Sequence, residues 1–376
     1  MPRLVISTVG TSLLTNQINL RRDPKDWSSR LQEMANKTQD DIRKYHQDVD
    51  DIIQQLRERA EKTLSNGTIL EIRDASAELN GIYGLYEEQL EQGKQDVHWL
   101  ITTDTAQGQV AAEIVKDFLQ TKNFTVDIYQ PKDLSTTSTR QFTQGIDELL
   151  KWMDEIIPGY KDSGYIICFN LVGGFKALQG YVNTIGMFYQ ANEMIYIFEG
   201  SSEIIKIPRL PIQVDKSVIK PVQFALMAEG AWIKLSELID VPKTLLFGDG
   251  DEATLSHWGR LIWNRSKLDF LSRELLEFPL LKYESSFIKD YESKKEPKDK
   301  LKLQEVLGKI SHLLIKHKGD TAVLKGDGGV LYEVYTNKGG IAHFRVTQGI
   351  RVSCTSSGGV LHLRHYGKEP DVNKNP

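Results

Sequence analysis

The feature that most limits how this chain can fold is a regular alternation of apolar runs with amphipathic stretches. Apolar runs of strand length lie at residues 3–9, 97–102, 124–129, 165–171 and 193–199. Stretches with apolar residues at helical spacing lie at 108–120, 139–156 and 175–189. Strands that alternate with helices predict an α/β fold with a mainly parallel, doubly wound sheet.

Residues 20–95 interrupt this alternation with a long, polar and strongly charged insert. Its apolar residues recur at helical spacing: Ile42, Tyr45, Val49, Ile52, Ile53 and Leu56. This spacing predicts helices that pack on the outside of the sheet.

Polar residues follow four of the expected strands, where a doubly wound sheet binds its ligands. These loops contain Gly10-Thr11-Ser12, Thr103-Asp104-Thr105, Leu134-Ser135-Thr136-Thr137 and the segment from Asn170 to Lys176. For any single loop, a hydroxyl that caps a helix is the simpler explanation. Four such loops together favour a site for a phosphate-bearing ligand. The sequence contains neither GxGxxG nor GxxxxGK[ST], so NAD and Walker-type ATP binding are poorly supported.

The last hundred residues are basic. Residues 277–376 contain 17 lysines and arginines against 12 acidic residues, a net charge of +5, whereas the whole chain carries −4, so the first 276 residues carry −9. Between residues 341 and 367 apolar and polar residues alternate, which predicts strands with one polar face. The side chains expected on that face are His343, Arg345, Arg351, His362, Arg364 and Tyr366. Cations on one sheet face suit the binding of a phosphodiester.

The C-terminal module is expected to be a small α+β domain. Strands are predicted at 280–285, 321–325, 330–336, 341–347, 350–355 and 360–366, and helices at 286–292 and 300–317. Helices then cover one face of an antiparallel sheet, and the opposite face is free for a substrate. A mostly helical connector at 211–276, with helices at 221–238 and 257–276, separates this module at 277–376 from the first domain at 1–210.

The remaining composition limits the cellular setting. Cys168 and Cys354 lie far apart in strand-like runs, and no Cys/His spacing indicates zinc, so neither a disulfide nor a metal is expected. No apolar run approaches the roughly 20 residues of a membrane span, and the first residues lack the pattern of an export signal. These observations predict a cytoplasmic protein with no membrane partner.

Three loops of the first domain resemble those of the CARF family, the CRISPR-associated Rossmann-like sensors of cyclic oligoadenylate. They are STVGTSLLTN at the start, TTDTAQG in the second loop and LVGGFKAL in the last. The resemblance covers residues 1–210 and implies a homodimer that binds the cyclic nucleotide across two copies. It assigns ligand contacts to Gly10, Thr11, Ser12, Thr103, Asp104, Thr105, Asn170, Gly173, Gly174 and Lys176. Ser12 and Lys176 also match the places of residues that assist ring opening in CARF ring nucleases.

Residues 277–376 resemble RelE/ParE-type toxins, through LKYESSFIKDY and the strands HFRV, IRV and LHLRHYG. This resemblance implies metal-free cleavage of mRNA on the ribosome, with the 2′-hydroxyl of the RNA as nucleophile. It implies phosphate contacts from Arg345, Arg351 and Arg364, and proton transfer by His365, Tyr366 or His343. No Arg-x4-His motif of the HEPN ribonucleases is present.

The two resemblances together imply a type III CRISPR ancillary effector for antiviral defence. Cyclic tetraadenylate would be the activator, no cofactor would be needed, and the activated protein would be an mRNA endoribonuclease. Two alternatives remain open: a ring nuclease whose C-terminal part is only a lid, and a ligand-gated transcription regulator that uses the connector helices on DNA.

Overall fold

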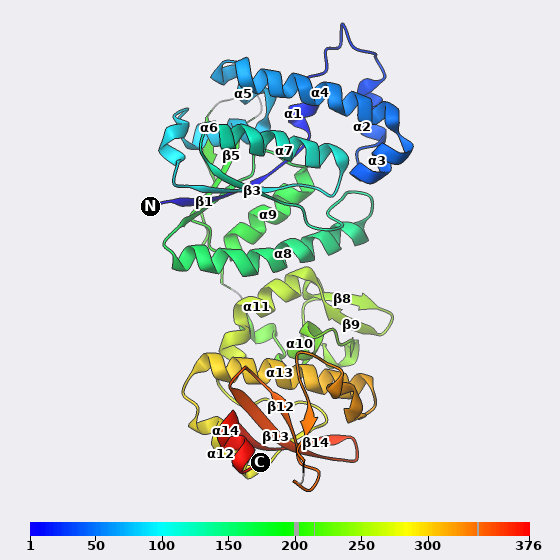
Figure 1. Cartoon of the computed structure of the whole chain (residues 1–376), viewed down its shortest axis with the longest axis vertical. Helices are drawn as coiled ribbons and strands as arrows, with labels where there is room; N and C mark the ends of the chain where they lie inside the picture. The colour runs from blue at the N-terminus through cyan, green and yellow to red at the C-terminus, as the bar shows by residue number, and fades with distance from the viewer. Residues whose placement is uncertain (199–202, 214, 337) are drawn as a thin grey trace. The chain divides into compact units, whose positions relative to one another are not determined.

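A computed structural model of the chain describes residues 1–198, 203–213, 215–336 and 338–376 (Figure 1). The chain divides into two compact units, Met1–Ile212 and Gln213–Pro376. Each unit has a hydrophobic core of its own. Residue 199, at the expected end of the fifth strand, lies outside the described residues.

The first unit is built on a sheet with the order β3-β2-β1-β4-β5-β6. Its strands are β1 (Arg3–Thr8), β2 (Val97–Ile101), β3 (Thr125–Tyr129), β4 (Ile166–Asn170), β5 (Glu193–Ile197) and β6 (Ile204–Lys206). Strands β1 to β5 are parallel, and only β6 is antiparallel to its neighbour β5. The predicted α/β fold with a mainly parallel sheet is confirmed. The strand order reverses between β1 and β4, so the crevice of a doubly wound sheet opens there.

Helices cover both faces of this sheet (Figure 1). The helices that connect its strands are α7 (Ala106–Thr121), α8 (Thr139–Asp162) and α9 (Lys176–Phe188), close to the predicted ranges. In Figure 1, α7 lies on one side of the strands, and α8 and α9 lie on the other. The face of α7 that includes Val110, Ile114 and Phe118 is buried, as its spacing of apolar residues requires.

The insert is helical, as predicted. It comprises α1 (Ser12–Thr15), α2 (Trp27–Glu33), α3 (Gln39–Tyr45), α4 (Gln47–Asn66), α5 (Ile69–Ala75), α6 (Ala77–Leu85) and the 3-10 helix η1 (Leu90–Gly93). Thr68 and Glu71 form a capping box at the start of α5, and Ser76 caps α6. The expectation that Tyr45 faces the core is wrong, since it is 64% exposed. Helix α3 ends at Tyr45, whereas Val49, Ile53 and Leu56 lie on α4 and are buried as predicted.

In the second unit, the expected connector and the C-terminal module share one hydrophobic core. The connector elements are α10 (Pro221–Ala228), β7 (Ile233–Lys234), β8 (Leu246–Asp249), β9 (Glu252–Leu255) and α11 (His257–Leu271). The predicted helix at 221–238 is wrong beyond Ala228, because Gly230 adopts φ +96° and the chain turns into β7. The buried amide of Gln304 donates to the carbonyls of Leu271 and Glu274, so the end of α11 is held against the C-terminal module.

The C-terminal sheet has the order β10-β14-β13-β12-β11. Its strands are β10 (Leu281–Tyr283), β11 (Glu333–Val334), β12 (Ala342–Arg345), β13 (Ile350–Ser357) and β14 (Val360–Lys368). The helices are α12 (Ser285–Ser293), α13 (Pro297–Lys316) and α14 (Glu369–Lys374). The predicted strand at 321–325 is wrong: Asp320 caps a 3-10 helix there, η5 (Thr321–Lys325). The sheet is also not wholly antiparallel, because β10 and β14 are parallel.

A buried polar network joins the insert to the amino ends of β1 and β2. The hydroxyl of Tyr86 lies 2.8 Å from Asp96 Oδ2 and 3.0 Å from His98 Nε2, and the backbone N–H of Arg3 donates to Asp96 Oδ1 at 2.7 Å. His98 is fully buried, and this burial lowers its pKa from 6.5 to about 3. The imidazole is therefore neutral in the folded protein at neutral pH.

The His98 pKa predicts a loss of stability in acid. The unfolded chain binds a proton at His98 below about pH 6.5 and the folded chain does not, so the stabilisation present above that pH is lost as the pH falls toward about 3. Between about pH 6.5 and 5 this residue should cost about 2 kcal/mol of unfolding free energy. Denaturation at both pH values should show a smaller loss for His98→Gln than for the parent. His46→Gln is the control, and an equal loss in parent and His98→Gln would contradict the assignment.

Candidate functional site

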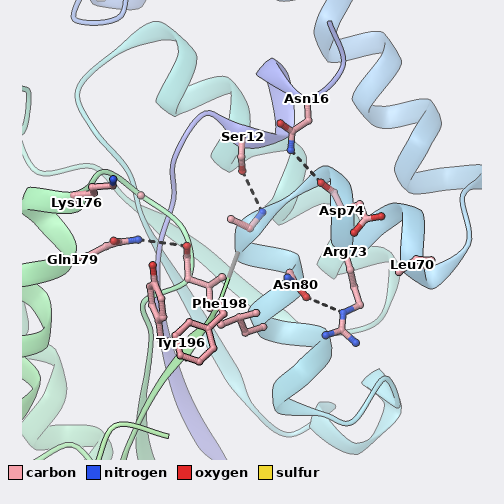
Figure 2. Close-up of a pocket in the computed structure, with 14 residues that line it drawn as sticks. Ser12, Asn16, Leu70, Arg73, Asp74, Asn80, Lys176, Gln179, Tyr196 and Phe198 are labelled. Atoms are coloured by element: carbon pink, nitrogen blue, oxygen red, sulfur yellow. Dashed lines mark hydrogen bonds between the residues drawn. The ribbon is translucent and has the colours of Figure 1, made fainter. Parts of the chain in front are cut away.

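A pocket of about 540 Å³ lies at the carboxyl ends of the strands of the first unit (Figure 2). Ser12 lines it from the loop after β1, Gly174 and Lys176 from the loop after β4, and Tyr196 and Phe198 from the end of β5. The insert helices α5 and α6 form the opposite wall. The pocket therefore opens where the strand order reverses between β1 and β4, as expected for a doubly wound sheet.

The loop after β1 is tied to the insert by two side chains. The Ser12 hydroxyl oxygen accepts the backbone N–H of Ala77, the first residue of α6, at 3.2 Å. The Asn16 amide donates to the carbonyls of Asp74 and Ala75 at 3.1 and 3.3 Å. Ser12 thus lies on the pocket wall at the N-terminal end of α6.

The loop after β4 lies close to the loop after β1, and glycine backbone atoms form the closest approach. The hydroxyl of Thr8 donates to Gly173 O at 2.6 Å, and the Gln179 amide donates to the same oxygen at 3.0 Å. Gly174 adopts φ +88°, which favours glycine. A Cβ on Gly10 would lie only 3.0 Å from Gly174 N. The two loops therefore meet through backbone atoms at these glycines.

Lys176 is the cation of this pocket for which the described residues supply no acidic partner. Its side chain is exposed, and no hydrogen bond or ion pair joins it to another residue within the described ranges. It is also the first residue of α9, where the helix dipole disfavours a positive charge. A lysine at this place does not stabilise the helix, but together with the helix N-terminus it attracts an anion.

The insert adds further polar groups to the pocket. Arg73 is buried, and its guanidinium donates to Asn80 Oδ1 at 2.8 Å and pairs with Glu88 at 2.5 Å. Asp74 is exposed on the same wall, and Leu70 is 65% exposed beside it. The pocket thus combines two cations, one carboxylate, side-chain amides and apolar side chains.

Several predicted ligand residues do not line this pocket. Asn170 is fully buried and donates to Ser7 Oγ and Glu78 O at 3.2 and 3.1 Å, so it supports the loop from below. Thr103, Asp104 and Thr105 lie after β2: the two threonine hydroxyls bond to each other at 2.8 Å, and Asp104 accepts the amide of Gln130. Gly10, Thr11 and Gly173 belong to the two loops at the pocket but do not line it.

The pocket residues that the insert contributes were not predicted: Leu70, Arg73, Asp74, Ala77 and Asn80. They lie on helices, whereas the predicted site residues were chosen because they directly follow expected strands. Tyr196 and Phe198 could have been found, because they end an expected strand in the same way as the other loops.

In the second unit, one face of the C-terminal sheet gathers most of the predicted catalytic residues. Arg345 pairs with Arg351 across β12 and β13, and His343, Ser353 and His365 are aligned across three strands. The expectation that Tyr366 lies on this face is wrong. A bulge after Ser353 leaves Arg364 unpaired and shifts the alternation, so that Tyr366 points into the core and is 2% exposed.

Most of these basic side chains have an acidic neighbour. Arg351 Nη2 lies 3.2 Å from Glu369, His365 Nδ1 lies 3.1 Å from Asp290, Arg364 Nε lies 3.8 Å from Glu284, and His343 Nε2 lies 3.8 Å from Glu333. Arg351 is also buried and donates to the carbonyls of Thr347, Gln348 and Ile350. Arg351 therefore holds the turn between β12 and β13, and its predicted place as an accessible phosphate contact is corrected.

Other polar atoms on this face have no partner in the described chain. These atoms are His343 Nδ1, Arg345 Nε and the hydroxyl of the fully buried Ser353. Burial lowers the pKa of His343, so its imidazole is neutral and able to accept a proton at neutral pH. Buried polar atoms without protein partners are costly in a fold, and ordered water commonly satisfies them.

Comparison with known families bears on the first unit. Residues 73–210 match the sequence model of a family described as CRISPR-associated protein (Cas_APE2256). This segment is similar to a CRISPR-associated family. It starts at Arg73 on the pocket wall and includes β2 to β6, with Gly174, Lys176 and Phe198 of the pocket. Among the described residues, no helix is long and apolar enough to cross a membrane.

The contacts of Arg351 predict a structural role that stability measurements can detect. Arg351→Ala removes three hydrogen bonds to the 347–350 turn and the pairing with Glu369, so we expect a loss of about 2 kcal/mol in unfolding free energy. Urea unfolding of the full chain measures it. Arg273→Ala, at an exposed arginine, should change stability by less than about 0.5 kcal/mol. Unchanged stability of Arg351→Ala would return this residue to the candidates for substrate contact.

Proposed function

We propose that this protein is a type III CRISPR ancillary effector that is switched on by a cyclic oligoadenylate. The first unit binds the ligand, and the second unit is a RelE-like, metal-independent endoribonuclease that cuts mRNA on the ribosome. The observation that carries the proposal is that Lys176, which has no partner among the described residues, lines the same pocket as Ser12, in a segment similar to a CRISPR-associated family.

The chemistry of the pocket supports a cyclic oligoadenylate. Such a ring offers phosphodiester groups, which suit Lys176 and the N-terminus of α9, and adenine bases, which suit the exposed faces of Leu70 and Phe198. We propose cyclic tetraadenylate as the ligand. Its symmetry fits a homodimer in which each copy contributes one such pocket.

In the second unit we assign phosphate binding to Arg345 and Arg364 and proton transfer to His365 and His343. The 2′-hydroxyl oxygen of the RNA attacks the adjacent phosphorus, and the bond to the 5′-oxygen breaks. One histidine, in its neutral form, takes the proton of the 2′-hydroxyl, and the other histidine, in its protonated form, donates a proton to the leaving 5′-oxygen. The products are a 2′,3′-cyclic phosphate and a 5′-hydroxyl. Asp290 supports this role, since its contact with Nδ1 fixes the His365 ring and leaves Nε2 for proton transfer.

A second activity, opening of the bound ring by the first unit, is favoured by one further observation. Ser12 and Lys176, the two residues that match those of ring nucleases, line the same pocket. Ring opening would use the same chemistry on the 2′-hydroxyl of the ligand and would limit the lifetime of the signal. Incubation of the full chain with labelled cyclic tetraadenylate separates the two activities, because linear products would appear without any added mRNA.

We expect Lys176→Met to weaken the binding of cyclic tetraadenylate by about tenfold or more, because a charge-assisted hydrogen bond to phosphate is lost. Isothermal titration of the full chain measures the change. Lys62→Met, at an exposed lysine of α4, is the matched control and should bind like the parent. Parent affinity in Lys176→Met would contradict this site for the ligand.

Arg345→Ala should abolish mRNA cutting in a translation reaction that contains cyclic tetraadenylate, while ligand affinity stays at the parent value. Toeprinting of ribosome-bound message detects the cuts, and Arg273→Ala is the matched control. Equal cutting with and without the ligand would refute the sensor role, and full cutting by Arg345→Ala would refute the assigned phosphate contact.

A further inference from the structure

A fully buried carboxylate lies between the insert and the two loops of the pocket. Glu78 is the second residue of α6 and is 0% exposed. Its Oε1 accepts the backbone N–H of Gly10 at 2.7 Å, and its Oε2 accepts the hydroxyl of Ser76 at 2.8 Å. Both carboxylate oxygens thus have partners, as burial of such a group requires.

The Glu78 carboxylate also limits how closely the loop after β4 can approach α6. A Cβ on Gly173 would lie 2.1 Å from Glu78 Oε1 and 2.5 Å from its Cδ, far inside van der Waals contact. Gly173 does not have a positive φ, so the side chain of Glu78, and not the backbone conformation, requires glycine at this position. Glu78 therefore contacts one glycine from each of the two loops.

The backbone of Glu78 takes part in the same junction. Its carbonyl accepts the amide of Asn170, at the end of β4, at 3.1 Å, and the same amide also donates to Ser7 of β1 at 3.2 Å. Helix α6, which starts at this junction, presents Ala77 and Asn80 to the pocket. Capping of α6 explains the bond from Ser76. It does not explain the bond to Gly10, which is 68 residues away in the sequence.

We infer that Glu78 is the positioning residue of the ligand pocket: it holds the loops after β1 and β4 at the spacing at which they receive the ligand. This assigns a role to the helical insert, which supplies Glu78 and one wall of the pocket. Glu78 does not touch the ligand itself, because it is fully buried and does not line the pocket. The inference rests on the proposed binding of a cyclic oligoadenylate in this pocket.

A double-mutant cycle in the full chain tests this role. Gly173→Ala should displace Glu78 and weaken the binding of cyclic tetraadenylate by about tenfold or more, and Glu78→Ala should do the same by releasing Gly10. Because Glu78→Ala also removes the atoms that a Cβ on Gly173 would meet, the double variant should bind within about threefold of the weaker single variant. Independent effects would instead multiply to about a hundredfold loss, which would overturn the inference.

Two further variants separate positioning from loss of folding. Glu78→Gln keeps an oxygen for Gly10 and gains a donor for Ser76, so binding should stay within about threefold of the parent. Gly180→Ala is the matched glycine control on α9, since a Cβ there meets nothing within 4 Å, and it should bind like the parent. Weak binding by Glu78→Gln would show that the charge, and not the position of the loops, matters.

Hydrogen exchange of the Gly10 amide supplies a readout that needs no ligand. In Gly173→Ala this amide should exchange at least about tenfold faster than in the parent and in Gly180→Ala, because its acceptor is displaced. Unchanged exchange would overturn the inference even if no variant binds the nucleotide. Failure of the parent protein to bind cyclic tetraadenylate would refute the proposed function alone.

Discussion

The close approach of two backbone loops, after β1 and after β4, is the constraint on which the candidate ligand site depends. These loops meet through Gly10 and Gly174, with Gly173 packed on a buried carboxylate. A side chain at Gly10 or Gly174 would push the two loops apart, because its Cβ would lie only 3.0 Å from the facing atoms. The parallel sheet supplies the frame, because reversal of the strand order between β1 and β4 places both loops at the same edge.

The helical insert contributes directly to the pocket. Its helices α5 and α6 form a wall of the pocket, and Ser12 and Asn16 bond to their backbone. The second unit instead places basic side chains on one face of its sheet. There, pairs such as His365 with Asp290 orient a ring, whereas the pairing of Arg351 with Glu369 serves the fold.

The sequence predicted the mainly parallel sheet and the pocket residues Ser12, Gly174 and Lys176, because the loops at the carboxyl ends of parallel strands meet at one edge of a doubly wound sheet. It could not predict Arg73 or Asn80, since a polar residue on a helix looks the same whether it faces solvent or a cavity. Tyr366 was misplaced because one bulge residue, Arg364, inverts the alternation after it. Thr103 to Thr105 have the composition of a ligand loop, but their hydroxyls bond locally after β2, away from the crevice.

A structure of the protein with cyclic tetraadenylate would test most directly whether the ring binds in the pocket that Ser12 and Lys176 line. A phosphate of the ring is expected within hydrogen-bonding distance of Lys176 Nζ, with the loops of Gly10 and Gly174 still in contact. A ring bound away from the pocket that Ser12 and Lys176 line, or no bound ring at saturating nucleotide, would contradict it.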